Sequence, residues 1–105
     1  MPARRADRSD WPDFTASALR EFFRLDDVIQ DRFVAVFPEF VEHPHHPSPT
    51  LDVQPLRNDP HRWRLAIEGY RALFSVRSGY PLIEEIEPRT DRTYVRFGRL
   101  MSRST

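Results

Sequence analysis

Arginines at alternating positions are the feature of this sequence with the clearest chemical meaning. Arg62 and Arg64 flank Trp63, and Arg71 follows seven residues after Arg64. Alternate side chains of a β-strand lie on one face, so Arg62 and Arg64 are expected to project together. A guanidinium stays charged at physiological pH, presents a planar fork of donors to phosphate and stacks on bases. The pattern favours a face that binds nucleic-acid phosphates, and the other interpretation is an ordinary solvated sheet face.

More basic residues follow the last expected strand. Arg89, Arg92 and Tyr94 are expected to return to the same face, and a basic tail continues from Arg96. We expect Arg92 and Arg96 to contribute to RNA binding, although such a tail is also typical of a solvated chain end.

Three histidines lie close together among prolines, at His43, His45 and His46. A metal site requires ligands that converge, and usually a fourth group from elsewhere in the chain. A proline-rich loop does not favour this geometry, so we expect no metal and no other cofactor. Contact of His46 with RNA is the functional alternative.

Length and composition limit the remaining classes of protein. The chain has 105 residues, which is one domain, and its sixteen cations are all Arg and are matched by sixteen acids. Without Cys there is no disulfide, thiolate zinc site or cysteine nucleophile. The net charge is −4 over residues 1–52 and +4 over residues 53–105, which can mark a surface that binds a polyanion.

The hydropathy pattern predicts a cytoplasmic protein with no membrane partner. No apolar run approaches the ~20 residues of a membrane span, and the polar start of the chain lacks the apolar stretch of a signal peptide. Residues 1–10 are expected to be a flexible arm, and residues 11–105 a single domain.

The elements that must position the arginines begin with two helices. A short first strand over Trp11 to Phe14 is expected to precede a helix over Thr15 to Leu25 and another over Asp26 to about Phe40. Asp26 is a plausible N-cap, and Pro38 predicts a kink or a stop near Phe37. The core is expected to contain the phenylalanines of both helices, Phe22, Phe23, Phe33, Phe37 and Phe40.

A period of two replaces the helical pattern after a proline-rich segment. His43 to Thr50 is expected to be a rigid, extended linker. About four antiparallel strands follow, with turns at Arg57 to Pro60, Glu68-Gly69 and Ser78-Gly79. The predicted fold class is α+β, an N-terminal helical hairpin packed on an antiparallel sheet.

Several short segments occur in an order and spacing that resemble the RelE/ParE toxin superfamily. They are Pro55-Leu56-Arg57, the pair Arg62 and Arg64, Gly69-Tyr70-Arg71, and Arg89 followed by Tyr94. The helical hairpin and His46-Pro47-Ser48 also resemble the family, and the likeness extends over about residues 12–96.

The resemblance implies a toxin of a type II toxin–antitoxin system, most similar to RelE-like messenger-RNA interferases. Such toxins cleave messenger RNA on the ribosome without a metal, through attack of the 2′-hydroxyl on the adjacent phosphate, and so inhibit translation. The implied partners are a cognate antitoxin, the ribosome and messenger RNA. By position, Arg62 and Arg64 match two basic strand residues, Arg71 the arginine at the scissile phosphate, Arg89 a later phosphate-binding arginine, and Tyr94 the C-terminal tyrosine.

The sequence also departs from the family pattern. Arg occupies positions where some relatives have Lys, and an arginine is a poor proton carrier. Proton transfer is therefore expected to fall to Tyr94, Glu68 or His61. Pro88 stands where many ribonuclease members have His. A ParE-like gyrase inhibitor and a non-catalytic binding module on the same fold therefore remain alternatives.

An acidic run lies on the last expected strand, at Glu84, Glu85 and Glu87. It is expected to be a solvated edge, and binding of a basic partner segment is the alternative.

Overall fold

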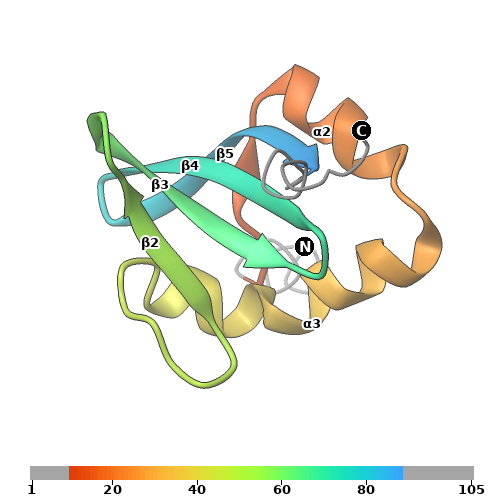
Figure 1. Cartoon of the computed structure of the whole chain (residues 1–105), viewed down its shortest axis with the longest axis horizontal. Coiled ribbons are helices and arrows are strands. Elements are labelled where there is room, and N and C mark those ends of the chain that lie inside the picture. The colour runs from red at the N-terminus through yellow and green to blue at the C-terminus, as the bar shows by residue number, and fades with distance from the viewer. Residues whose placement is uncertain (1–9, 89–105) are drawn as a thin grey trace, which may run out of the picture.

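A computed structural model describes residues 10–88 of the chain (Figure 1). All but the last residue of the predicted flexible arm lies outside this range, as do Arg89, Arg92, Tyr94 and Arg96. In chain order the elements are β1 Asp13–Phe14, α2 Ala16–Phe23, α3 Asp27–Glu42, β2 Asp52–Leu56, β3 Asp59–Ile67, β4 Tyr70–Arg77 and β5 Tyr80–Pro88.

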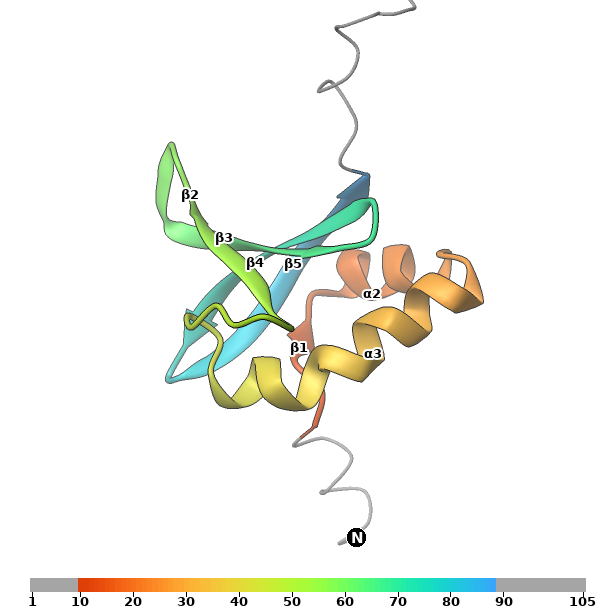
Figure 2. The ribbon, with the colours of Figure 1, turned by 60° about the horizontal axis from the view of Figure 1, so that its bottom comes forward.

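The strands form one sheet in the order β1-β5-β4-β3-β2. Strands β2 to β5 are an antiparallel meander, and β1 joins the edge of β5 in parallel. Figure 2 shows α2 and α3 on the same side of the sheet, so among residues 10–88 no helix covers its other face. The predicted α+β class is confirmed, with one strand more than the four of the expected meander because the short β1 also pairs.

Local signals in the sequence explain where the helices begin. Thr15 is the N-cap of α2, and its Oγ1 accepts a hydrogen bond from the backbone N–H of Ala18 at 3.1 Å. Asp26 occupies the N-cap of α3 as predicted, without a side-chain capping bond. The Gln30 side chain instead donates to the carbonyl of Leu25 at 2.9 Å, which ties α3 to the end of the preceding turn.

We expected a kink or a stop near Phe37. The stop is wrong, because α3 continues through Pro38 to Glu42. Pro38 lies on the exposed side of α3, where water can satisfy the carbonyl that has lost its N–H partner. Phe37 and Phe40 on either side are fully buried and hold both halves of the helix against the core.

The core is an aromatic layer between the helices and the sheet. Its fully buried members include Phe22, Phe33, Phe37, Phe40, Leu65, Phe74 and Ile83. The ring of Phe37 lies 5.2 Å from Trp11 and 6.0 Å from Phe22. Phe23, which we expected in the core, is 58% exposed. Since each residue turns a helix by about 100°, Phe22 faces the sheet and Phe23 points away from it.

The segment from His43 to Thr50 is not the extended linker that its prolines predict. Backbone hydrogen bonds between Ser48 and Leu51 fold it into a tight turn. Ser48 Oγ and Thr50 Oγ1 each donate to the Glu39 carboxylate at 2.7 Å. The hydrogen bonds from Thr50 and then from Ser48 lower the pKa of Glu39 below its usual value.

Two of the three predicted turns of the meander are confirmed, and the third is shorter than predicted. Glu68-Gly69 and Ser78-Gly79 connect the strands as expected, with Ser78 and Gly79 at φ of 54° and 80°. Two consecutive residues in this left-handed region suit the twist of a two-residue hairpin. The first turn contains only Arg57 and Asn58, because Asp59 and Pro60 already belong to β3.

Replacing the central ring of the aromatic layer is expected to destabilise the fold. Phe37→Ala should lower the free energy of unfolding by about 3–5 kcal/mol, because it leaves a cavity among rings that cannot fully collapse. Phe23→Ala on the exposed side of α2 should cost about 1 kcal/mol or less. Urea unfolding of both variants measures the difference, and equal losses would contradict the assignment of Phe37 to the core.

The Glu39 carboxylate is expected to make stability depend on pH. Its pKa is lowered in the folded state, so its contribution is present above the unfolded-state pKa and is lost as the pH falls through the folded-state pKa. Glu39→Gln should therefore unfold with a weaker dependence on acid than the wild type. Thermal melts between about pH 6 and 3 test this, and parallel curves for the two proteins would contradict it.

Candidate functional site

The predicted alternation of β3 is confirmed by the residues that meet the core, since Trp63 and Ile67 pack against it beside Leu65. Leu65 is fully buried on the helix side, and Arg62 and Arg64 therefore lie on the opposite side. Ala66 pairs with Arg71 across the β3–β4 ladder, so Arg71 shares their face. We call this side, which carries Arg62, Arg64, Arg71 and Ser75, the open face.

The three arginines form a row along the two strands. Arg64 pairs with Leu73, two residues from Arg71, and Arg62 lies two residues further along β3. At about 3.3 Å per residue the row extends for roughly 13 Å. It therefore suits consecutive phosphates of a backbone better than one phosphate held by all three groups.

Each arginine of the row lies beside a carboxylate. Arg62 Nε is 3.1 Å from Glu84 Oε1 and its Nη2 is 3.3 Å from Glu85 Oε2. Arg71 Nε donates to Glu87 Oε2 at 2.6 Å. Arg64 Nη1 lies 3.6 Å from an Asp52 oxygen. The acidic run is thus not a solvated edge, because its side chains pair with the arginines that we expect to bind phosphate.

A β-bulge in β5 places two consecutive acids on the open face. Leu73 pairs with Glu85 but Phe74 pairs with Ile83, so Glu84 is an extra residue in β5. Glu84 accepts a hydrogen bond from Ser75 Oγ at 3.2 Å and contacts Arg62 Nε, while Glu85 contacts Arg62 Nη2. Regular alternation would have placed Glu84 and Glu85 on opposite faces.

The pairing leaves hydrogen-bond donors unused. Arg62 Nε and Arg64 Nη1 are buried atoms without a hydrogen bond, because the nearby carboxylates are poorly aligned or too distant. Within residues 10–88, Arg71 donates through Nε alone, so both of its Nη groups remain open to another acceptor. An anion can therefore bind to these unused donors while the arginines keep some of their contacts with the carboxylates.

Within the described residues, neither Glu68 nor His61 forms an ion pair or hydrogen bond with Arg71. Glu68 is 3.7 Å from Arg32 of α3, and Arg71 instead has Glu87 beside it. His61 is exposed at the start of β3, where its backbone N–H donates to Asp59. With Arg62 and Glu84 it lines a shallow hollow at the far end of the row. Both roles stay predictions.

The histidine loop lies on the helix side of β3. His45 stacks on Trp63 with the ring centres 4.3 Å apart, a contact that the sequence did not reveal. Trp63 is only partly buried against the core, and His45 covers part of it. His46 lies near His43, at 5.8 Å between ring centres, and its contact with RNA stays a prediction.

Within residues 10–88, no group of three His, Cys, Asp or Glu side chains could hold a metal ion. No helix in the same range is long and apolar enough to cross a membrane.

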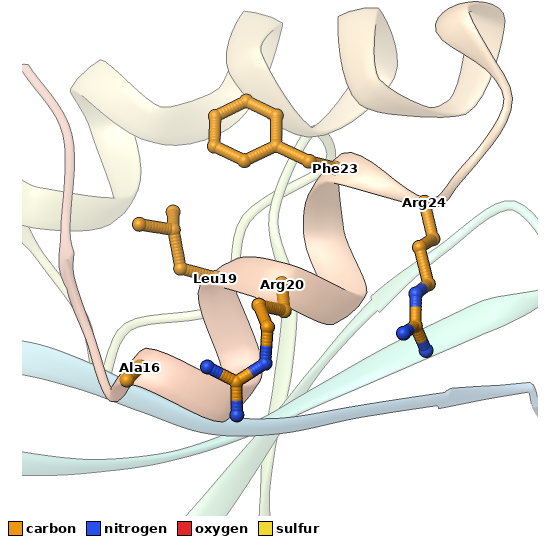
Figure 3. Close-up of a pocket in the computed structure, with 5 residues that line it drawn as sticks. All are labelled: Ala16, Leu19, Arg20, Phe23 and Arg24. Carbon is orange, nitrogen blue, oxygen red and sulfur yellow. The ribbon is translucent and has the colours of Figure 1, made fainter.

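A second, more apolar hollow lies on α2. Its lining residues are Ala16, Leu19, Arg20, Phe23 and Arg24 (Figure 3). Figure 3 shows Leu19 and Phe23 projecting on one side of the helix and the two arginines on the other. We did not predict this patch from the sequence, because the apolar stripe of α2 is wider than the area that the sheet covers.

The architecture that carries these residues is similar to solved RelE toxins. The isolated Escherichia coli RelE toxin matches with a TM-score of 0.66 and 18% identity, over 86% of this chain and 96% of that chain. The intact E. coli RelBE toxin–antitoxin complex matches at 0.63 and 19%, over 77% and 98%. The RelB–RelE complex of Methanococcus jannaschii matches at 0.61 and 13%, over 73% and 89%.

No protein-family model and no curated protein sequence matches the chain. The similarity to these solved structures shows that the chain has the RelE-like toxin fold. The family resemblance inferred from the sequence is thus confirmed at the level of the fold.

The carboxylates beside Arg62 are expected to weaken its binding to phosphate. In Glu84→Gln/Glu85→Gln, Arg62 keeps only the distant Asp59 carboxylate, 3.9 Å from Nη1, so binding of a short single-stranded RNA should gain about one phosphate contact. The slope of log affinity against log salt concentration should become steeper by about 0.7.

Asp31→Asn/Glu42→Gln is the charge-matched control, since both acids lie on exposed parts of α3. A slope that changes equally in the two double variants would show that the effect is one of net charge alone.

Proposed function

We propose that this protein is the toxin of a toxin–antitoxin pair, a cytoplasmic endoribonuclease that cleaves messenger RNA on the ribosome and inhibits translation. The observation that carries the proposal is the row of Arg62, Arg64 and Arg71 on the open face of a RelE-like sheet.

The chemistry is metal-independent phosphodiester cleavage. The ribose 2′-oxygen attacks the neighbouring phosphorus, and negative charge grows on the phosphate oxygens in the transition state. Arg71 contacts the scissile phosphate through its unused Nη groups, and Arg62 and Arg64 bind adjacent phosphates. Fixed cationic donors of this kind stabilise the transition state because they need no reorientation during the reaction. Arg89 and Tyr94 belong to the same proposed site but lie outside the described residues.

A cognate antitoxin is the proposed protein partner. The similar structures include RelB–RelE complexes from E. coli and M. jannaschii. An antitoxin that covers the open face or displaces the C-terminal part of the toxin would prevent access of RNA.

A ParE-like inhibitor of gyrase, or a non-catalytic module, is the second candidate. The observation in its favour is the pairing of all three arginines with carboxylates, which makes the open face close to neutral. A protein target tolerates such a face better than a polyanion does.

Loss of the Arg71 guanidinium is expected to abolish toxicity. Induction of the wild-type chain without its antitoxin should arrest growth and cleave messenger RNA on translating ribosomes. Arg71→Ala should lower the cleavage rate by about 10²–10³-fold, as for the loss of one transition-state donor.

Arg77→Ala is the matched control, because Arg77 lies on the same strand and face, about 20 Å from Arg71, and is 68% exposed. It should keep wild-type activity. A wild-type chain that neither arrests growth nor cleaves RNA would overturn the nuclease. Arrest with DNA damage that persists in the Arg62, Arg64 and Arg71 triple Ala variant would favour the gyrase inhibitor.

A further inference from the structure

The proposed cleavage requires a base for the 2′-hydroxyl, and the arginine row cannot supply one. Guanidinium groups do not lose a proton in proteins under ordinary conditions. The open face does, however, carry carboxylates, which are ordinary general bases. The base must be a carboxylate that lies where the 2′-hydroxyl would be.

Glu87 is the carboxylate that lies beside Arg71. The two residues pair directly across β4 and β5, and Glu87 Oε2 is 2.6 Å from Arg71 Nε. About one third of each side chain is exposed, so both remain accessible to a substrate.

The other acids of the open face are placed differently. Glu84 is held by Ser75, Arg62 and Arg77, toward the opposite end of the row. Glu85 contacts Arg62 at that same end. Asp52 lies beside Arg64 on the β2 side of the sheet.

We propose that Glu87 is the general base of the RNA cleavage. This inference rests on the proposed endoribonuclease activity and on the place of Arg71 at the scissile phosphate. The planar guanidinium of Arg71 has two edges for acceptors. Its Nε side holds Glu87, and its Nη side is open to the phosphate, so the two acceptors lie next to each other. A 2′-hydroxyl attached next to that phosphate then comes within hydrogen-bond reach of the carboxylate.

The proton and the bonds balance in one displacement. A Glu87 oxygen takes the proton of the 2′-hydroxyl while the 2′-oxygen forms a bond to phosphorus. The bond from phosphorus to the 5′-oxygen breaks, and that oxygen takes a proton from a water molecule. The hydroxide that remains is neutralised by the proton that Glu87 releases. The products are a 2′,3′-cyclic phosphate and a 5′-hydroxyl.

Glu87→Gln tests the assignment with little change of shape. A glutamine oxygen still accepts from Arg71 Nε, but the side chain no longer takes a proton. On translating ribosomes in a purified system, the single-turnover cleavage rate should fall by about 10²–10⁴-fold. Co-sedimentation of the variant with the same ribosomes should be unchanged or tighter. Glu42→Gln, which removes an exposed carboxylate at the end of α3, should cleave as the wild type does.

Chemical rescue distinguishes a base from a side chain that only orients Arg71. In Glu87→Ala the space beside Arg71 is open, and added sodium formate should restore part of the cleavage. Sodium chloride at the same ionic strength should not. Absence of rescue in a variant whose thermal melt shows that it is folded would contradict the proposal.

The outcomes separate this inference from the proposed function. If the wild type does not cleave RNA, the proposed function itself is wrong. If the wild type cleaves, Arg71→Ala does not, and Glu87→Gln cleaves at the wild-type rate or faster, the nuclease stands and the general base is not Glu87. A faster variant would mean that Glu87 competes with the phosphate for Arg71.

Discussion

The register between β4 and β5 is the constraint on which the candidate site depends. It sets Glu87 opposite Arg71, and the bulge at Glu84 turns two consecutive acids toward Arg62. A single-residue slip would move these carboxylates to the core side, where a charge without a partner is costly. The aromatic layer resists such a slip, because Ile83 and Phe74 are buried on that side at the same point of the ladder.

The zero net charge of the chain reflects, in part, arginines and carboxylates that pair with each other on the sheet. Residues 53–88 contain five Arg and five acids, and the excess of +4 in the second half falls in residues 89–105, with five Arg and one Asp. Residues 53–88 are thus electrically balanced by their own side chains. An RNA that binds the open face meets arginines that already have carboxylate partners, so affinity there depends on geometry more than on long-range attraction.

The helical layer stabilises the fold, and the open face carries the residues of the proposed chemistry. Thr15 caps the start of α2, and Glu39 anchors the turn that follows α3. The phenylalanines between the helices and the sheet hold the strands in place. Few residues then serve both stability and the proposed chemistry. The apolar patch of Leu19 and Phe23 on α2 belongs to neither group, since the sheet does not cover it.

The sequence by itself determined the fold class, the order of the elements and the face on which Arg62, Arg64 and Arg71 lie. Each of these follows from a short-range period of two or 3.6 residues. It did not determine the path of α3 through Pro38, the turn from Ser48 to Leu51, or the partners of the arginines. Those depend on contacts between residues far apart in the chain and on a bulge that breaks the period. Because a bulge shifts every later side chain to the other face, only the tertiary structure could bring Glu84, Glu85 and Glu87 beside the arginine row.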